Sequence, residues 1–303
     1  MFETYKEKIV AFMQSYDYPI EAQEEIVQAF EQAFSSAQAF MELKACLQAY
    51  SEDCEADILK IFALCRKIAE NGKGNVYPVV YPIYMSVLIL LAEIAKKHYA
   101  AKALPVDMWK DNFTDLRYKL YECKLVKGVW GTFVPDWYIR FLNVSRFTFG
   151  KLQFEIENFR HTYDKNGVTL CADSKVLNVH IPRTGKGLFP QDVEESCAAA
   201  ALFFKEEYGV EQAVFVCHSW LLYPENKKML KETSNLYSFI SRFDIIEVEE
   251  YKDYKEVWRL FDMDYDPDLT KMPADTSLRK AYIERMQKGE KTGCAYGVFV
   301  YKK

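Results

Sequence analysis

The sequence predicts an α+β protein of two domains, an all-α domain followed by a mixed α/β sheet domain. The chain has 303 residues, about twice the usual length of one domain. Apolar residues recur at helical spacing up to about residue 140, whereas apolar runs typical of strands appear after it. We therefore expect a helical domain over residues 1–140 and a sheet domain over residues 141–303.

The first domain shows several apolar stripes and no group of side chains that points to chemistry. The run VVYPIYMSVLILLAEIA is interrupted by Pro82 and Glu93, so a buried helix from about 83 to 99 fits it better than a membrane span. A further helix is expected from about Pro105 to Lys124, with an acidic first turn. The stripes predict helix packing around a core.

Composition and charge exclude several classes of protein. The formal net charge of −5 argues against nucleic-acid binding, which normally uses a basic face. The eight cysteines show no C-x-x-C motif and no metal-like pairing with the four histidines, so we expect reduced thiols and no metal. The N-terminal MFETYKEKIV lacks the pattern of a signal peptide. We expect a cytoplasmic protein without membrane or nucleic-acid partners.

The second domain begins with sequences typical of strands. FTFGKLQFEI, residues 147–156, is rich in aromatic and aliphatic residues and predicts a strand. The turn residues 164–167, DKNG, predict a hairpin that joins this strand to GVTLC. At the end of the chain, residues 279–288 fit a helix capped by Asp275-Thr276-Ser277, and GCAYGVFVY fits a last strand.

A strand, a helix and a second strand then follow within about 45 residues. Residues 175–181 fit the first strand, and 190–208 fit a helix with proline at its start and Gly209 after its end. The apolar run 212–222 fits the second strand. This order predicts a right-handed βαβ unit with parallel strands.

The loop between the first of these strands and the helix predicts an anion site. Arg183, Thr184, Gly185, Lys186 and Gly187 lie at the helix N-terminus, where free N–H groups and the helix dipole favour negative charge. Neither the P-loop pattern nor the Rossmann glycine pattern is present. The alternative is a plain flexible turn with exposed basic residues.

Four stretches, HIPRTGKG, VFVCHSWLLYP, SNLYSFISRF and PADTSLRKAYIERM, resemble a bacterial family of acyltransferases. That family joins a helical N-acyltransferase N-terminal domain to a C-terminal domain similar to the GNAT acetyltransferases. The resemblance covers most of the chain from about residue 25 and is strongest from Val144 onward. It implies that the sheet domain is GNAT-like.

The GNAT pattern implies that acyl-CoA places its pyrophosphate on the loop from Thr184 to Leu188. Gly185 and Gly187 match its two small positions, whereas its basic position falls at Pro182 and Arg183 comes one residue later. The pattern also implies that the two parallel strands splay and hold the pantetheine arm between them. The thioester is then expected near the ends of these strands.

His180 and His218 end these strands and are the candidates for the general base that takes a proton from an amine. Histidine titrates near neutral pH, which suits that role. His218 is the first choice, since strand alternation predicts that Trp220 lines the same side. The alternative is that each histidine is a structural hydrogen-bonding group. Ser219 and Cys217 are expected on the opposite face from His218 and form no dyad with it.

Two further residues match GNAT positions, and the implied activity has two readings. Asn235 falls where GNATs often contact the cofactor and Tyr237 where they often place a general acid, although Tyr237 also fits a packing role.

The first reading is a CoA-dependent N-acyltransferase that moves an acyl group, expected to be acetyl, from acyl-CoA to a small-molecule or peptide amine. The second is a non-catalytic GNAT-like module that binds a ligand or a protein. The acidic stretch 247–268 is either a solvated face or an attraction for a cationic amine.

Overall fold

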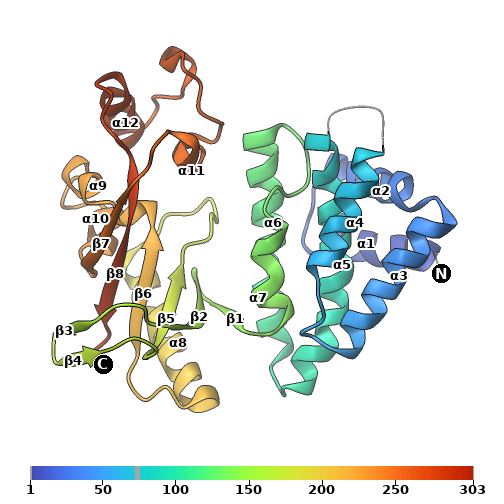
Figure 1. Ribbon diagram of the computed structural model, residues 1–303, viewed down its shortest axis with the longest axis horizontal. Helices are drawn as coiled ribbons and strands as arrows, with labels where there is room; N and C mark the ends of the chain where they lie inside the picture. The colour runs from blue at the N-terminus through green and yellow to red at the C-terminus, as the bar shows by residue number, and fades with distance from the viewer. Residues whose placement is uncertain (1, 72–75, 303) are drawn as a thin grey trace. The chain divides into compact units, whose positions relative to one another are not determined.

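A computed structural model describes residues 2–71 and 76–302. Contacts divide the chain into two compact units, Met1–Phe147 and Thr148–Lys303, where the sequence predicted a boundary after residue 140. Helices make up the first unit, and a mixed six-stranded sheet with helices makes up the second (Figure 1). The predicted fold class, an all-α domain followed by a mixed sheet domain, is confirmed.

The helical unit packs around one long apolar helix. The α-helices are α1 (Phe2–Ser15), α2 (Ile20–Phe34), α3 (Ala37–Glu52), α4 (Leu59–Glu70), α5 (Val76–Ala101), α6 (Val106–Lys127) and α7 (Ile139–Leu142), with a 3-10 turn η1 (Pro135–Tyr138). The central helix α5 contacts each of α1, α2, α3, α4 and α6. By length and composition α5 is the one described helix that could cross a membrane, but 78% of its most apolar window is buried inside the protein. Its apolar character therefore reflects its place in the core.

The six-stranded sheet has the order β1-β2-β5-β6-β8-β7 (Figure 1). Its strands are β1 (Arg146–Phe149), β2 (Leu152–Asn158), β5 (Lys175–His180), β6 (Val214–Ser219), β7 (Asp244–Glu250) and β8 (Gly293–Val300). Strands β5 and β6 are parallel, and helix α8 (Pro190–Tyr208) connects them. The predicted βαβ unit is thus present, and its helix begins and ends where the proline and Gly209 indicated.

The smaller elements of the second unit surround the sheet. They are the strands β3 (Tyr163–Lys165) and β4 (Val168–Leu170), the helices α9 (Pro224–Met229), α10 (Asn235–Ile240), α11 (Trp258–Phe261) and α12 (Ser277–Gln287), and the 3-10 turns η2 (Trp220–Leu222), η3 (Lys255–Val257) and η4 (Leu269–Lys271). Thr276 caps α12 by accepting a hydrogen bond from the Arg279 amide, as predicted.

Three predictions about strands were wrong. The run 147–156 is two strands, β1 and β2, and β2 pairs with β5 instead of forming a hairpin with GVTLC. The turn at Asn166-Gly167, where both residues have positive φ, joins the short strands β3 and β4. The predicted strand 212–222 ends at Ser219, because the Ser219 hydroxyl accepts a hydrogen bond from the Leu221 amide and starts the turn η2.

The sheet is covered on both faces. Helix α8 lies over one face, where the ring of Phe204 is buried and stands 6.4 Å from that of Phe149 on β1. The β3–β4 hairpin covers part of the other face, where Tyr163 and Val168 pack with Val216 and Tyr296. Asn178 pairs with Val216 in the parallel ladder, so side chains two residues further along both strands share that second face. His180 and His218 therefore lie on the face opposite α8.

Candidate functional site

The loop from Thr184 to Leu188 presents free amides at the N-terminus of α8. The Lys186 amide donates to the Thr184 hydroxyl. In the described part of the chain the amides of Gly185, Gly187 and Leu188 have no hydrogen-bond partner. Gly185 has a φ of +73°, which favours glycine, and the loop is mostly exposed. Unpaired amides beside a helix start are suited to an anionic group.

A lysine that sequence reasoning missed adds positive charge to this loop. The Lys151 ammonium lies 2.8 Å from the Gly187 carbonyl oxygen and 2.6 Å from an oxygen of Asp192 in the first turn of α8. The Lys151 amide donates to the Ser196 hydroxyl, which fixes the β1–β2 turn against α8. Lys151 is 36 positions from Gly187 along the chain, so no local motif could have identified it.

Asn235 also approaches the loop, whereas Tyr237 has a different neighbour. A Cβ atom built on Gly187 would lie 3.9 Å from the Asn235 amide nitrogen. Both residues are half-buried in α10, and the Lys227 ammonium stands 5.0 Å from the centre of the Tyr237 ring. The fold thus brings Asn235 to the predicted cofactor loop. The predicted roles of the two residues remain predictions.

Arg183 points to an acidic partner. Its guanidinium forms an ion pair with Asp262, and a second arginine, Arg279, contacts the same carboxylate at 2.6 Å. Arg183 therefore connects the loop to the segment that follows α11. Its predicted contact with the cofactor would compete with this ion pair.

The two parallel strands touch over a short length. The ladder joins Leu177 to Phe215 and Asn178 to Val216, although β5 continues to His180 and β6 to Ser219. This arrangement agrees with the separation of the strand ends that the resemblance implied. The candidate loop and both candidate histidines lie at these ends.

Each candidate base has a hydrogen-bonding partner on a neighbouring strand. His180 Nε2 lies 2.8 Å from Glu155 Oε1 on β2, and both side chains are largely buried. His218 Nε2 lies 3.1 Å from the Cys294 sulfur on β8, and His218 is exposed. Imidazoles held in this way keep a defined orientation, which both a base and a structural group require.

The predicted placement of Trp220 beside His218 was wrong. Trp220 belongs to the 3-10 turn η2, so strand alternation does not apply to it, and its ring packs 6.3 Å from that of Tyr282 on α12. Trp220 therefore contributes to the core under α12.

Cys217 is buried, and burial raises the pKa of its thiol to about 12.

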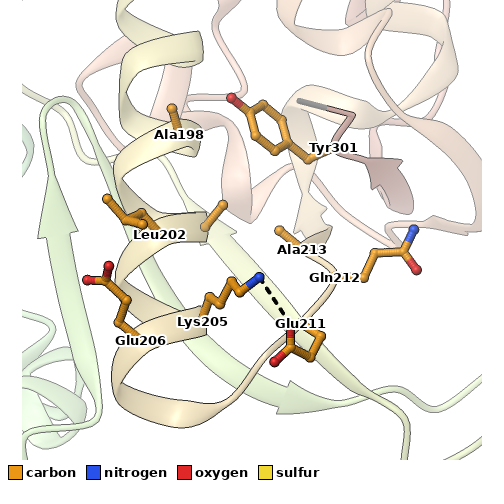
Figure 2. Close-up of a pocket in the computed structure, with 9 residues that line it drawn as sticks. Ala198, Leu202, Lys205, Glu206, Glu211, Gln212, Ala213 and Tyr301 are labelled. Atoms are coloured by element: carbon orange, nitrogen blue, oxygen red, sulfur yellow. Dashed lines mark ion pairs between the residues drawn. The ribbon is translucent and has the colours of Figure 1, made fainter.

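A pocket of about 370 Å³ lies elsewhere in the second unit (Figure 2). It is lined by the second half of α8, including Ala198 and Leu202, and by residues 211–213 and Tyr301. The ion pair between Lys205 and Glu211 crosses it. These residues belong to the end of the βαβ unit opposite the loop, so the pocket is separate from the candidate site.

Each of the two units matches a known protein-domain family. Residues 7–144 match the N-acyltransferase N-terminal domain, and residues 147–299 match the GNAT-like C-terminal domain. The chain therefore belongs to the acyltransferase family that combines these two domains. No curated protein matches the chain.

Solved structures share the fold over almost the whole chain. One is an acyltransferase in complex with decanoyl-CoA and teicoplanin, with a TM-score of 0.71 and 18% identity over 96% of this chain and 86% of that one. Another is an acyltransferase mutant in complex with octanoyl-CoA, with a TM-score of 0.72 and 18% identity over 98% and 88% of the two chains. A third, in complex with decanoyl-CoA, has a TM-score of 0.62 and 16% identity over 97% and 99%. At these identities the likeness establishes the fold.

Proposed function

We propose that the protein is a CoA-dependent N-acyltransferase that moves an acyl group from acyl-CoA to an amine. The observation that carries the proposal is the set of unpaired amides of Gly185, Gly187 and Leu188 before α8, beside the ends of two separating parallel strands. Strand ends of this kind are the usual ligand position in α/β units. The related folds that hold acyl-CoA support the same assignment.

In the proposed complex the amides of the loop bind the pyrophosphate, with Lys151 and Lys186 adding positive charge nearby. Asn235 contacts the cofactor from α10, and Arg183 contributes when it leaves Asp262. The pantetheine arm runs between β5 and β6 toward His180 and His218. The positions of these residues at the loop or at the strand ends support the proposed roles.

The chemistry requires few groups. An amine attacks the thioester carbonyl, its proton passes to a base, and CoA leaves as a thiol once the thiolate is protonated. We assign the base role to His218 first, because it is exposed on the sheet face away from α8, and to His180 second. Tyr237 is the proposed acid for the leaving thiolate.

Acidic residues favour a cationic acceptor. Glu247 and Glu249 are exposed on β7, close to His218 on β6 across the intervening strand β8. Their negative charge would attract a protonated amine before it loses its proton. A small-molecule acceptor is supported by the related complex that contains teicoplanin, and a peptide amine remains an alternative acceptor.

The acyl group and the compartment are part of the proposal. The sequence predicted acetyl, whereas the related structures hold octanoyl-CoA and decanoyl-CoA, so short and medium chains both belong in the test. The proposed compartment is the cytoplasm, and the eight free cysteines support this proposal.

The test is a panel of acyl-CoAs from acetyl to decanoyl, with free adenine nucleotides as controls. A binding acyl-CoA should raise the melting temperature, more so the tighter it binds, and nucleotides, which lack the pantetheine arm and the acyl group, should raise it less. Amine acceptors are then incubated with the best acyl-CoA, and the amide is detected by mass spectrometry. No stabilisation by any acyl-CoA would remove the proposal. Stabilisation without any amide would favour the non-catalytic module.

A further inference from the structure

Three adjacent strands place an imidazole, a thiol and a carboxylate side by side. His218 lies on β6, Cys294 on β8 and Glu249 on β7. Glu249 is the direct cross-strand partner of Cys294, and the partner of His218 is Tyr296, two residues from Cys294. All three side chains therefore project from the same face of the sheet.

The distances between their donor atoms suit one metal ion. His218 Nε2 is 3.1 Å from Cys294 Sγ, which is 3.8 Å from Glu249 Oε2. All three atoms lie within 4.8 Å of one another. Donors around a tetrahedral Zn²⁺ lie about 3.5 Å apart, given metal–ligand distances of about 2.0–2.3 Å. Small rotations of side chains would bring the three donors to that spacing.

The charges around the Cys294 thiol favour a role as a ligand of a cation over a role as a nucleophile. Burial raises the pKa of the Cys294 thiol, a hydrogen bond with Tyr251 acts in the opposite direction, and the Glu249 carboxylate raises the pKa again. A carboxylate beside a thiol opposes the thiolate that a nucleophile needs. A divalent cation reverses this effect, because it stabilises the thiolate and the carboxylate together.

We propose that His218, Glu249 and Cys294 form a zinc site with a fourth position open to solvent. Imidazole, thiolate and carboxylate are the ligands that Zn²⁺ commonly takes, and three protein ligands leave room for water. When zinc binds, the Cys294 thiol releases its proton to solvent, and His218 Nε2 donates its lone pair to the zinc ion. The zinc ion then prevents His218 from accepting a proton from an amine.

This inhibitory consequence rests on the proposed function, whereas the zinc site itself does not. Zinc would reversibly switch off the acyl transfer assigned to His218. Sequence spacing gave no sign of such a site, since the three ligands are 31 and 45 positions apart along the chain. Only the pairing of β6, β8 and β7 brings them together.

The first experiment measures binding on the metal-free full-length protein, without acyl-CoA. Cobalt(II) should produce a thiolate-to-cobalt absorption band, and zinc should displace it. Cys294→Ser should lose the band, whereas Cys171→Ser, which removes an exposed thiol outside the site, should keep it. A wild-type protein without the band, or a Cys294→Ser variant with it, would overturn the proposal.

Calorimetric titration with zinc gives an independent measure. Loss of groups that only support a metal ligand costs about 10–100-fold in affinity, so Glu249→Gln should weaken zinc binding at least about tenfold. Circular dichroism checks that each variant is folded. If Cys294→Ser does not fold, the zinc affinity of Glu249→Gln tests the site instead. Equal zinc affinity in wild type and Glu249→Gln would contradict the site.

The activity experiment separates the two proposals. Zinc should inhibit amide formation by the wild type, a chelator should restore it, and Glu249→Gln should need at least about tenfold more zinc. A cobalt band without any acyl transfer leaves the zinc site standing and removes the proposed function. Acyl transfer that zinc at saturating concentration leaves unchanged removes the inhibitory role.

Discussion

His180 and Glu155 form a hydrogen bond of 2.8 Å between the neighbouring strands β5 and β2, at the C-terminal end of β5. The carboxylate fixes the ring of the last residue of β5. Glu155 is 8% exposed, so the pair is mostly shielded from water. The pair therefore joins β2 to the C-terminal end of β5, the strand that precedes the candidate loop.

Removing this carboxylate should destabilise the second unit. Glu155→Ala leaves the ring of His180 without its acceptor, and such a loss at a buried site costs about 1–3 kcal/mol. Urea unfolding of the full chain, followed by circular dichroism, measures the change. Glu232→Ala, at an exposed position, should change stability by less than about 0.5 kcal/mol. Equal midpoints for the two variants would show that the pair contributes nothing.

Gly187→Val should weaken acyl-CoA binding without unfolding the protein. The nearest atoms to a Cβ at Gly187 are in the Phe189 ring, at 3.4–3.5 Å, which is ordinary contact, so the chain accepts it, but the added side chain would occupy the approach of the phosphate. We expect at least about tenfold weaker binding by calorimetry, which is about 1.4 kcal/mol. Gly185→Val is the contrasting variant, since its φ of +73° predicts lower stability as well. Unchanged affinity in folded Gly187→Val would rule out the loop as the phosphate site.

Asp262→Asn should strengthen acyl-CoA binding by releasing Arg183. Asparagine keeps the shape and tolerates the positive φ of this position, but it removes the charge that holds the guanidinium. Arg183 and Asp262 are only half-buried, and ion pairs that water still reaches contribute about 0–1 kcal/mol, so the gain should not exceed about fivefold. Arg183→Ala in the Asp262→Asn background should cancel the gain, which a double-mutant cycle measures. A gain that persists without Arg183 would exclude Arg183 as its cause.

His218→Ala should keep acyl-CoA affinity and lose turnover. General-base catalysis contributes about 10²–10⁴-fold to the rate, so kcat should fall by that factor, and imidazole in solution should restore part of it. All assays contain a chelator, so that metal binding does not enter. His161→Ala is the matched control, because His161 contacts Glu247 and Tyr296 without a place in the proposed chemistry. Normal turnover of His218→Ala would exclude it as the base and leave His180 to be tested.

A fragment of residues 145–303 should retain the sheet and bind acyl-CoA, and residues 1–140 should not. Every proposed cofactor contact lies between Lys151 and Tyr237, within the second compact unit. Circular dichroism checks folding, and calorimetry checks binding by each fragment. Acyl-CoA binding by the helical fragment alone would overturn this division of roles.

The local features of the candidate site could be predicted from sequence, because they depend on neighbouring residues. Pro190 and Gly209 marked the ends of α8 correctly, since each acts on the backbone at its own position. Lys151, Glu155 and Cys294 could not be found, because their partners come from other strands or from the start of α8. Only the folded sheet places them beside the loop and the histidines.

Two wrong predictions show where sequence patterns lose information. The apolar run through Trp220 looks like a continuous strand, but the hydrogen bond between Ser219 and the Leu221 amide turns the chain into η2. The Asn166-Gly167 turn correctly indicated a hairpin, but the pattern did not identify the two strands that it joins. These are β3 and β4, whereas β2 pairs with β5 over a longer stretch. Pairing of strands is decided by burial over the whole sheet, which a local window does not contain.

The short β5–β6 ladder makes the sheet two half-sheets joined by a narrow seam. One half consists of β1, β2 and β5, and the other of β6, β8 and β7. Backbone groups beyond the seam lack the neighbour that a longer ladder would give them, so the amides of a pantetheine arm would act there as a substitute strand. A pantetheine arm bound between β5 and β6 would then hold the two halves of the sheet together. Backbone amides at the ends of β5 and β6 should exchange hydrogen more slowly when acyl-CoA is bound.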